Sequence, residues 1–231
     1  MSKFLMILLS TGALMGASLS SAATIGFVED FDASVAGWED TNNNPLTWVA
    51  SGGVDDGSYA STTYNYNGYT SPFGGGPVTF RASFSDNASG GAFVGDYLTE
   101  GVGAISVSFR HDAPEPLTLF MRVASAANFP GAVINQAMSV TSGDWTTVLF
   151  ELDPSNPLCI GEGISCAAAL SNVQNLQFGT NAPAGLVDDD FAYTLDIDRV
   201  SILPVPEPST ALLMGLGLAG LQWSGRPRVR A

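Results

Sequence analysis

Apolar and polar residues alternate with a period of two along most of the chain between residues 24 and 203. Clusters of Gly, Pro, Asn, Asp and Ser separate these runs, as expected for half-buried antiparallel strands joined by turns. The predicted strands lie at 23–31, 46–51, 78–84, 104–111, 117–125, 145–152, 175–180 and 193–202. About eight short strands in one domain predict an all-β fold, a two-sheet antiparallel β-sandwich or jelly roll. We expect no more helix in this domain than one turn near residues 167–173.

The N-terminus has the pattern of a secretory signal peptide, which predicts an apolar signal helix. Lys3 precedes an apolar stretch, and the small residues Ser21 and Ala23 are spaced for cleavage after Ala23. Ser20 and Ala22 offer a second possible cleavage one residue earlier. The sequence therefore divides into a signal peptide (1–23), a sandwich domain (24–203) and a C-terminal tail (204–231).

Acidic residues strongly outnumber basic ones, with 22 Asp and Glu against eight Lys and Arg. Lys3 lies in the signal peptide and three arginines lie in the tail, so the domain keeps four arginines and no lysine. A surface of this charge repels phosphate backbones, and we therefore expect no nucleic acid partner.

Both cysteines, Cys159 and Cys166, lie in the glycine-containing stretch CIGEGISC. In an oxidising, exported setting this spacing predicts a local disulfide. Two cysteines without a nearby histidine are too few for a structural zinc site, and a catalytic thiol would need a histidine partner.

The stretch 51–77 is rich in glycine and aromatic residues and lacks a stable periodicity. Its tyrosines Tyr64, Tyr66 and Tyr69 are candidates for stacking on a glycan, because a ring face matches the apolar face of a sugar ring. The alternative is that these rings pack a long loop onto the sandwich. Composition does not separate the two hypotheses.

Catalytic motifs are scarce. His111 is the only histidine, and the sequence contains no nucleophile elbow, phosphate-binding loop or H-E-x-x-H motif. We therefore predict no catalytic residue and favour binding over catalysis. The alternative is an extracellular glycan-acting hydrolase that uses paired carboxylates about 5 to 10 Å apart.

Three segments carry a family resemblance: EDFDASVAGW (29–38), GAFVGDYLTEGVGAISVSFRH (91–111) and LDIDRVSIL (195–203). Together they resemble elements of laminin-B-like and galactose-binding-like jelly rolls. The resemblance implies a non-catalytic sandwich that often binds glycans or matrix components. It also implies a structural calcium ion between the first and last strands.

On the matching positions, the calcium ligands would be Asp198 of the closing strand and Asp32 or Glu29 near the opening aromatic residue. Calcium is a hard cation that takes carboxylate and carbonyl oxygens. The chain departs from a dense D-x-D-x-D loop, and the alternative is that Asp196 and Asp198 face solvent between buried neighbours. The acidic run 188–190 is a second calcium candidate.

The C-terminal tail has three parts: the tripeptide Pro206, Glu207 and Pro208, an apolar run at 209–223, and the arginines Arg226, Arg228 and Arg230. A helix of this run would be about 22 Å long, against a hydrocarbon core of about 30 Å. The run is thus short for a permanent span, and its arginines would stay on the cytoplasmic side. A plain membrane anchor is the alternative.

This order of parts resembles a PEP-CTERM sorting signal. The resemblance implies transient membrane insertion, cleavage by an exosortase-type membrane protease near Glu207, and an origin in Gram-negative bacteria that make exopolysaccharide and biofilm. We therefore expect an exported protein that passes through an inner-membrane intermediate to the cell surface or extracellular matrix, with exopolysaccharide as a candidate ligand.

Overall fold

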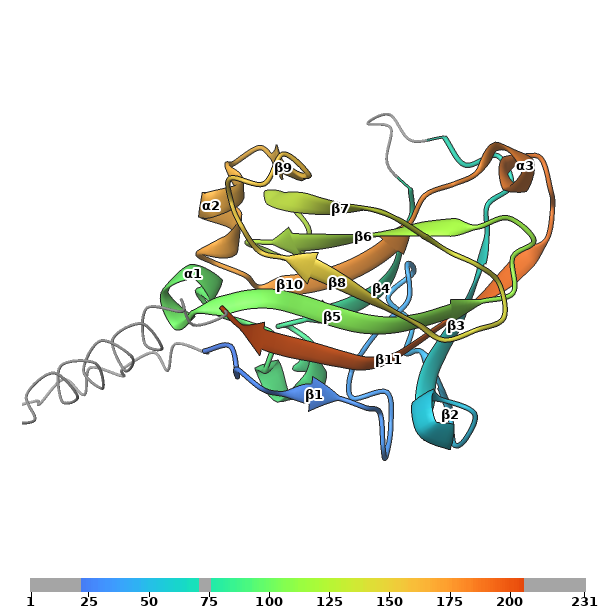
Figure 1. Cartoon of the computed structure of the whole chain (residues 1–231), viewed down its shortest axis with the longest axis horizontal. Coiled ribbons are helices and arrows are strands. Elements are labelled where there is room, and N and C mark those ends of the chain that lie inside the picture. The colour runs from blue at the N-terminus through green and yellow to red at the C-terminus, as the bar shows by residue number, and fades with distance from the viewer. Residues whose placement is uncertain (1–21, 71–75, 206–231) are drawn as a thin grey trace, which may run out of the picture.

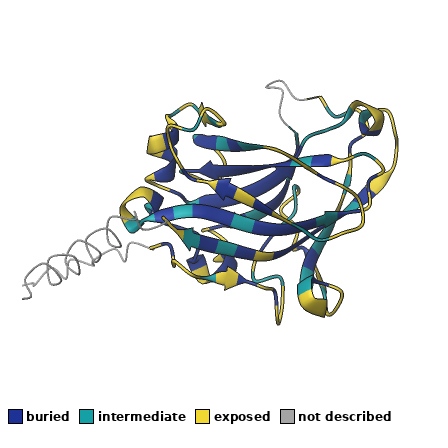
Figure 2. Cartoon of the chain, viewed as in Figure 1, coloured by how far each residue is buried: buried dark blue, intermediate teal, exposed yellow. Residues whose placement is uncertain are grey.

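The computed structural model of the chain describes residues 22–70 and 76–205 (Figure 1). The predicted signal helix, the apolar C-terminal helix and the sorting residues of the tail therefore lie outside the described residues. Within the described residues no helix is long and apolar enough to cross a membrane. Two antiparallel sheets pack face to face, with their buried residues between them (Figure 2).

The first sheet, here called sheet A, has the strand order β2-β3-β11-β5-β8, and β1 pairs with β11 beside β3. The first and last strands of the domain are thus neighbours, so the chain closes on itself along β11. The strands of sheet A are β1 (Val28–Glu29), β2 (Thr47–Val49), β3 (Tyr59–Asn65), β5 (Val102–His111), β8 (Thr146–Glu151) and β11 (Ala192–Pro204).

The second sheet, sheet B, has the strand order β4-β10-β6-β7-β9. Its strands are β4 (Val78–Ser83), β6 (Leu117–Ala124), β7 (Gly131–Val140), β9 (Cys159–Glu162) and β10 (Asn175–Thr180). In the central strand pair β6 and β10, side chains alternate between the core and the outer face, as the period of two requires.

Aromatic rings fill the core at one end of the sandwich. Trp38 is fully buried, stacks on Phe178 with the ring planes 2° apart, and meets Phe31 and Phe93 edge to face. Its indole N–H donates to the Ser89 hydroxyl at 2.8 Å, which satisfies the one polar atom of the ring. The tryptophan of the opening segment is therefore a core residue that ties the two sheets together.

The sequence prediction holds for the all-β sandwich class and for the eight predicted strands, each of which overlaps an observed strand. It missed three strands, β3, β7 and β9. The sequence predicted too few helices. Helix α2 (Cys166–Leu170) lies at the expected place. The described residues also contain two short helices, α1 (Tyr97–Glu100) and α3 (Ala184–Val187), and two 3-10 turns, η1 (Val54–Asp56) and η2 (Ala88–Gly91).

The predicted disulfide is confirmed. Cys159 and Cys166 are bonded, and the bond joins the first residue of β9 to the first residue of α2. The folded body includes Ala23, which is buried, and the last strand continues to Pro204.

Candidate functional site

The outer surface of sheet B, here called face B, carries an unusual row of polar side chains. Strand pairing places Gln177 directly between Arg81 and Arg122. Gln177 is fully buried and Arg122 is nearly so, although both project away from the core. A covering segment must therefore shield this face from solvent.

That covering segment is the 125–130 loop between β6 and β7. Arg122 donates to Glu162 Oε2 at 2.6 Å, to Gln177 Oε1 at 2.9 Å and to Asn128 Oδ1 at 3.1 Å. The Asn175 side-chain amide donates to the Ala127 carbonyl at 2.8 Å. One arginine thus holds the loop, an edge strand and the centre of the sheet together with charge-assisted hydrogen bonds.

Beside this loop face B is hollowed, with a cavity volume of about 260 Å³. Phe84, directly after β4, lines the hollow and has 52% of its surface exposed. The other lining residues carry small apolar, hydroxyl or amide side chains, without a charged group: Ser83, Ser85, Ser125, Ala126, Ala127, Asn172 and Gln174. One open aromatic ring surrounded by neutral hydrogen-bonding groups is suited to a neutral polyhydroxyl compound.

Several buried polar atoms on this side of the molecule have no hydrogen-bond partner among the described residues. They are Thr79 Oγ1, Arg81 Nε, Ser125 Oγ and Asn175 Oδ1. Leaving a buried polar group unpaired costs about 1 to 3 kcal/mol. Ser125 is one of the residues that line the hollow, and its hydroxyl oxygen is buried there.

A second hollow of about 200 Å³ lies between β7 and β8. Glu151 is the single acidic residue among its lining residues. Neither of these two hollows, within the described ranges, is lined by the pair of carboxylates that a glycosidase needs.

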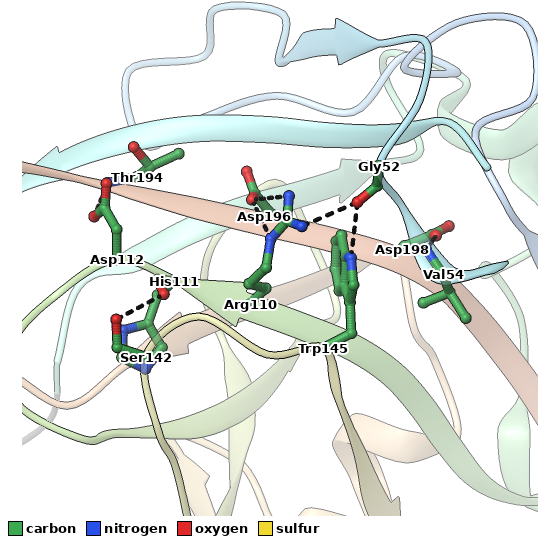
Figure 3. A network of polar contacts seen from close by, with 10 residues as sticks. All are labelled: Gly52, Val54, Arg110, His111, Asp112, Ser142, Trp145, Thr194, Asp196 and Asp198. Atoms are coloured by element: carbon green, nitrogen blue, oxygen red, sulfur yellow. Dashed lines mark hydrogen bonds and ion pairs between the residues drawn. The ribbon is translucent and has the colours of Figure 1, made fainter. Parts of the chain in front are cut away.

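The outer surface of sheet A, here called face A, has a closed arrangement around Arg110 (Figure 3). The guanidinium makes two hydrogen bonds to Asp196 Oδ2, at 2.8 and 3.0 Å, and one to the Gly52 carbonyl at 2.9 Å. Its central carbon lies 4.9 Å from the Tyr59 ring centre and 4.5 Å from that of Trp145. The indole N–H of Trp145 donates to the same Gly52 carbonyl at 3.0 Å, so these groups bind one another.

The three predicted stacking tyrosines form one ring cluster, with Tyr64 edge to face against both Tyr66 and Tyr69. Tyr66 is fully buried and its hydroxyl bonds Thr180 Oγ1, so burial raises the pKa of its phenol. A ring without an exposed face cannot stack on a sugar, and the prediction was wrong for Tyr66. Tyr64 and Tyr69 are half-buried, and for them stacking stays a prediction.

The predicted calcium ligands do not form one cluster. Glu29 is buried on β1 and accepts from the Phe31 N–H at 3.1 Å, whereas Asp32 is exposed. Asp198 is buried on β11 and accepts from the N–H groups of Val54 and Arg199. Burial raises the pKa of both buried carboxyls.

Within the described residues no group of three His, Cys, Asp or Glu side chains is placed to hold a metal ion. Oxygen atoms do gather near Asp198: a side chain at Gly53 would lie 2.8 Å from Asp198 Oδ2 and from the carbonyls of Gly57 and Ser58. Oxygen is the ligand that calcium prefers, and calcium binding stays a prediction.

His111 is a structural residue at the end of β5. It is almost fully buried, and its Nε2 lies 3.0 Å from the Val140 carbonyl oxygen. Burial lowers the pKa of its imidazole. Ser142 donates to the backbone carbonyl of His111, not to its ring, so this pair is not a catalytic arrangement.

Comparison with known protein families identifies a motif in the C-terminal tail. Residues 204–228 match the PEP-CTERM protein-sorting motif. The chain carries a PEP-CTERM sorting motif. The motif implies exosortase processing, export and sorting to the cell surface, as the sequence predicted. No curated protein matches the chain.

Several solved structures are similar to the chain at low identity. A CBM22-1 and GH10 portion of Clostridium thermocellum endo-1,4-β-D-xylanase, complexed with xylohexaose, is 15% identical over 78% of this chain and 28% of that one, with a TM-score of 0.44. The CBM22-1 xylan-binding domain from Paenibacillus barcinonensis is 16% identical over 81% of this chain and 100% of that one, with a TM-score of 0.44.

An exo-β-agarase is 10% identical over 81% of this chain and has a TM-score of 0.50. The chain covers only 26% of the agarase. This similarity agrees with the sandwich architecture seen here and concerns the fold alone.

The sequence did not indicate the residues that line the hollow of face B. They come from three short segments, at 83–85, 125–127 and 172–174. The pairing of β10 with both β4 and β6 brings these segments to one place. The one available signal was Phe84, the aromatic last residue of the predicted strand 78–84, which lies just beyond the observed β4.

Proposed function

We propose that this protein is exported, sorted to the cell surface through its PEP-CTERM motif, and binds a neutral glycan there without cleaving it. The hollow beside Phe84 carries the proposal: an exposed ring for the apolar face of a sugar, surrounded by hydroxyl and amide groups for its hydroxyls. Its volume of about 260 Å³ is just under the usual range for drug-sized ligands, about 300 to 1,000 Å³. A hollow of this size suits one terminal or protruding sugar unit of an extracellular polysaccharide.

Binding of the exported protein to polysaccharide purified from its own producer tests this proposal. We expect Phe84→Ala to weaken binding about tenfold or more, equivalent to about 1.4 kcal/mol, and Phe84→Trp to retain it. Phe191→Ala is the matched control for the hollow, because Phe191 is similarly exposed and packs on Tyr193, which does not line the hollow. Unchanged binding by Phe84→Ala would overturn the assignment of the hollow, and loss with Tyr69→Ala instead would place the site in the tyrosine cluster.

The same samples test the two other predictions for the domain. If calcium supports the fold or the site, a chelator lowers the affinity and the thermal midpoint, and added calcium restores both. If the domain were a hydrolase, incubation with the polysaccharide would release new reducing ends. We expect none, because the hollow lacks acidic side chains.

For the sorting step, we propose that an exosortase-type membrane protease of a Gram-negative bacterium cleaves the tail near Glu207 after transient insertion in the inner membrane. The protein would then reach the cell surface or the matrix. Glu207→Ala should leave unprocessed, membrane-associated precursor, detected by mass and fractionation. Normal release of this variant would argue against the role of Glu207.

A further inference from the structure

The backbone nitrogen of Ala23 lies next to the carboxylate of Glu100 and to Gly95. Its N–H donates to Glu100 Oε2, the last residue of α1, at 2.7 Å. Ala23 is only 8% exposed and belongs to the hydrophobic core, while the next residue, Thr24, donates to the Ala92 carbonyl at 3.0 Å. The ordered fold therefore includes residue 23.

Gly95 completes this site. Its φ is +149°, and a Cβ there would lie 2.7 Å from the Ala23 nitrogen and 2.8 Å from each oxygen of the Glu100 carboxylate. Both carboxylate oxygens and the nitrogen thus occupy the space next to this glycine. Any side chain at position 95 would displace them.

Glu100 lacks a side-chain cation partner in the part of the chain that the structure describes. The ion pairs there join Arg110 to Asp196, Arg122 to Glu162 and Arg199 to Asp55. A carboxylate is better matched by a cation than by one amide N–H, because an ammonium adds the attraction between opposite charges to the hydrogen bond. The α-ammonium of a new N-terminus would supply that cation.

We propose that export cleavage falls between Ala22 and Ala23, and that the resulting α-ammonium of Ala23 pairs with Glu100. The proposal rests on the export that is part of the proposed function, and it adds the cleavage position and the receptor for the new terminus. Water hydrolyses the bond between the Ala22 carbonyl carbon and the Ala23 nitrogen, catalysed by a signal peptidase. The hydroxyl stays on Ala22 as its carboxylate, and the nitrogen takes up protons to become an ammonium.

The competing cleavage, after Ala23, fits the fold less well. It would remove a buried alanine and the nitrogen that Glu100 binds. The new ammonium, on Thr24, would lie 3.0 Å from the Ala92 carbonyl and not at the carboxylate. Cleavage after Ala22 is also allowed by the small residues Ser20 and Ala22, at the third and first positions before the bond.

Intact mass and N-terminal sequencing of the exported protein test the position. We expect the sequence to begin Ala-Thr-Ile-Gly, and a protein beginning at Thr24 or at any other residue would overturn the proposal. Such a result leaves glycan binding at Phe84 unaffected. An exported fraction that lacks the protein altogether would instead contradict the export on which both proposals depend.

The ion pair has its own test, because the chain after the signal peptide contains no lysine. Amine acetylation therefore modifies only the N-terminus and removes its charge. In unmodified exported protein at pH 7, we expect Glu100→Gln to raise the unfolding equilibrium constant about fivefold, and Glu151→Gln, an exposed acid on β8, to change it little.

After acetylation we expect the effect of Glu100→Gln on the unfolding equilibrium constant to fall by at least half. The N-terminal charge that pairs with Glu100 is then gone. Reductive dimethylation keeps the positive charge and should preserve more of the effect than acetylation. Equal effects of Glu100→Gln before and after acetylation would refute the ammonium pairing, even if the cleavage position were correct.

Discussion

The two outer faces of the sandwich each have one arginine that fastens a loop, and the faces differ in what surrounds it. On face A, Arg110 binds Asp196 on the neighbouring strand and the Gly52 carbonyl (Figure 3). Its guanidinium also packs against the rings of Tyr59 and Trp145. On face B, Arg122 binds Glu162 on an edge strand, Gln177 on β10 and Asn128 of the covering loop.

This difference separates a closed surface from the surface that we propose to bind glycan. On face A the charged and aromatic groups pair with one another, except that Asp196 Oδ1 is buried without a hydrogen-bond partner among the described residues, and the aromatic rings contact a cation. Face B has an arginine that supports a loop beside an open hollow, with unpaired polar atoms nearby and an exposed ring at its edge. Arg122 therefore positions the loop beside the hollow, and in the proposed function other residues contact the glycan.

The largest expected effect on stability comes from Arg122→Met, which removes the hydrogen bonds that connect the covering loop to face B. It should lower the free energy of unfolding by about 3 kcal/mol, because the fully buried Gln177 carbonyl and the Glu162 carboxylate lose their donor. Urea denaturation measures this value. Arg199→Met is the control, because the ion pair of Arg199 with Asp55 is solvent-exposed and should contribute less than about 1 kcal/mol. Equal losses for the two variants would show that Arg122 has no special role.

A smaller effect is expected from Asp196→Asn on face A, about 1 to 2 kcal/mol. The charge partner of Arg110 is lost, but the guanidinium keeps the Gly52 carbonyl and both rings, and its side chain is 23% exposed to water. Denaturation of the variant gives the stability, and polysaccharide binding by the same sample gives the function. Stability should fall while affinity stays unchanged, and a loss of affinity beyond twofold would mean that face A contacts the glycan.

Sequence patterns predicted the sandwich well where hydrophobic contrast is strong. The missed strand β3 has the sequence YASTTYN, in which Ala, Ser and Thr occupy most positions, so alternation carries little hydrophobic signal. Strand β9 has only four residues. Both strands form because neighbours pair with them, through β11 and β2 for β3 and through β7 for β9, and such pairing is not encoded locally.

The candidate site was harder to predict from the sequence, because the register of the paired strands decides which residues lie next to each other. Arg110 and Asp196 are 86 residues apart in sequence and lie opposite each other only in the observed register of β5 and β11. Tyr66 looked like a loop residue, but it directly follows β3 and its ring turns into the core beside Thr180. The local sequence of a glycine-rich stretch does not distinguish a tyrosine with a buried ring from one with an exposed ring.

The smallest expected effect concerns the layers beneath the two faces. Under face A the core contains the titratable His111, whereas the inward side chains of the described strands β6 and β10, under face B, include no titratable group. Burial lowers the pKa of His111 below its ordinary value of 6.5, so the unfolded chain binds a proton more readily than the folded one. Stability should therefore fall as the pH drops below about 6.5, until the folded imidazole is itself protonated.

His111→Gln keeps a donor for the Val140 carbonyl but cannot titrate. The burial-raised pKa of Glu29 and Asp198 gives the opposite trend at lower pH, because the folded state then favours the protonated acids. Those acids are present in both proteins, so the difference between wild type and His111→Gln isolates the histidine. Between pH 7 and pH 5.5 wild type should lose stability relative to the variant, with about 1.4 kcal/mol for each unit of pKa difference between folded and unfolded states. Parallel stability curves would show that the acid sensitivity of the sandwich does not arise beneath face A.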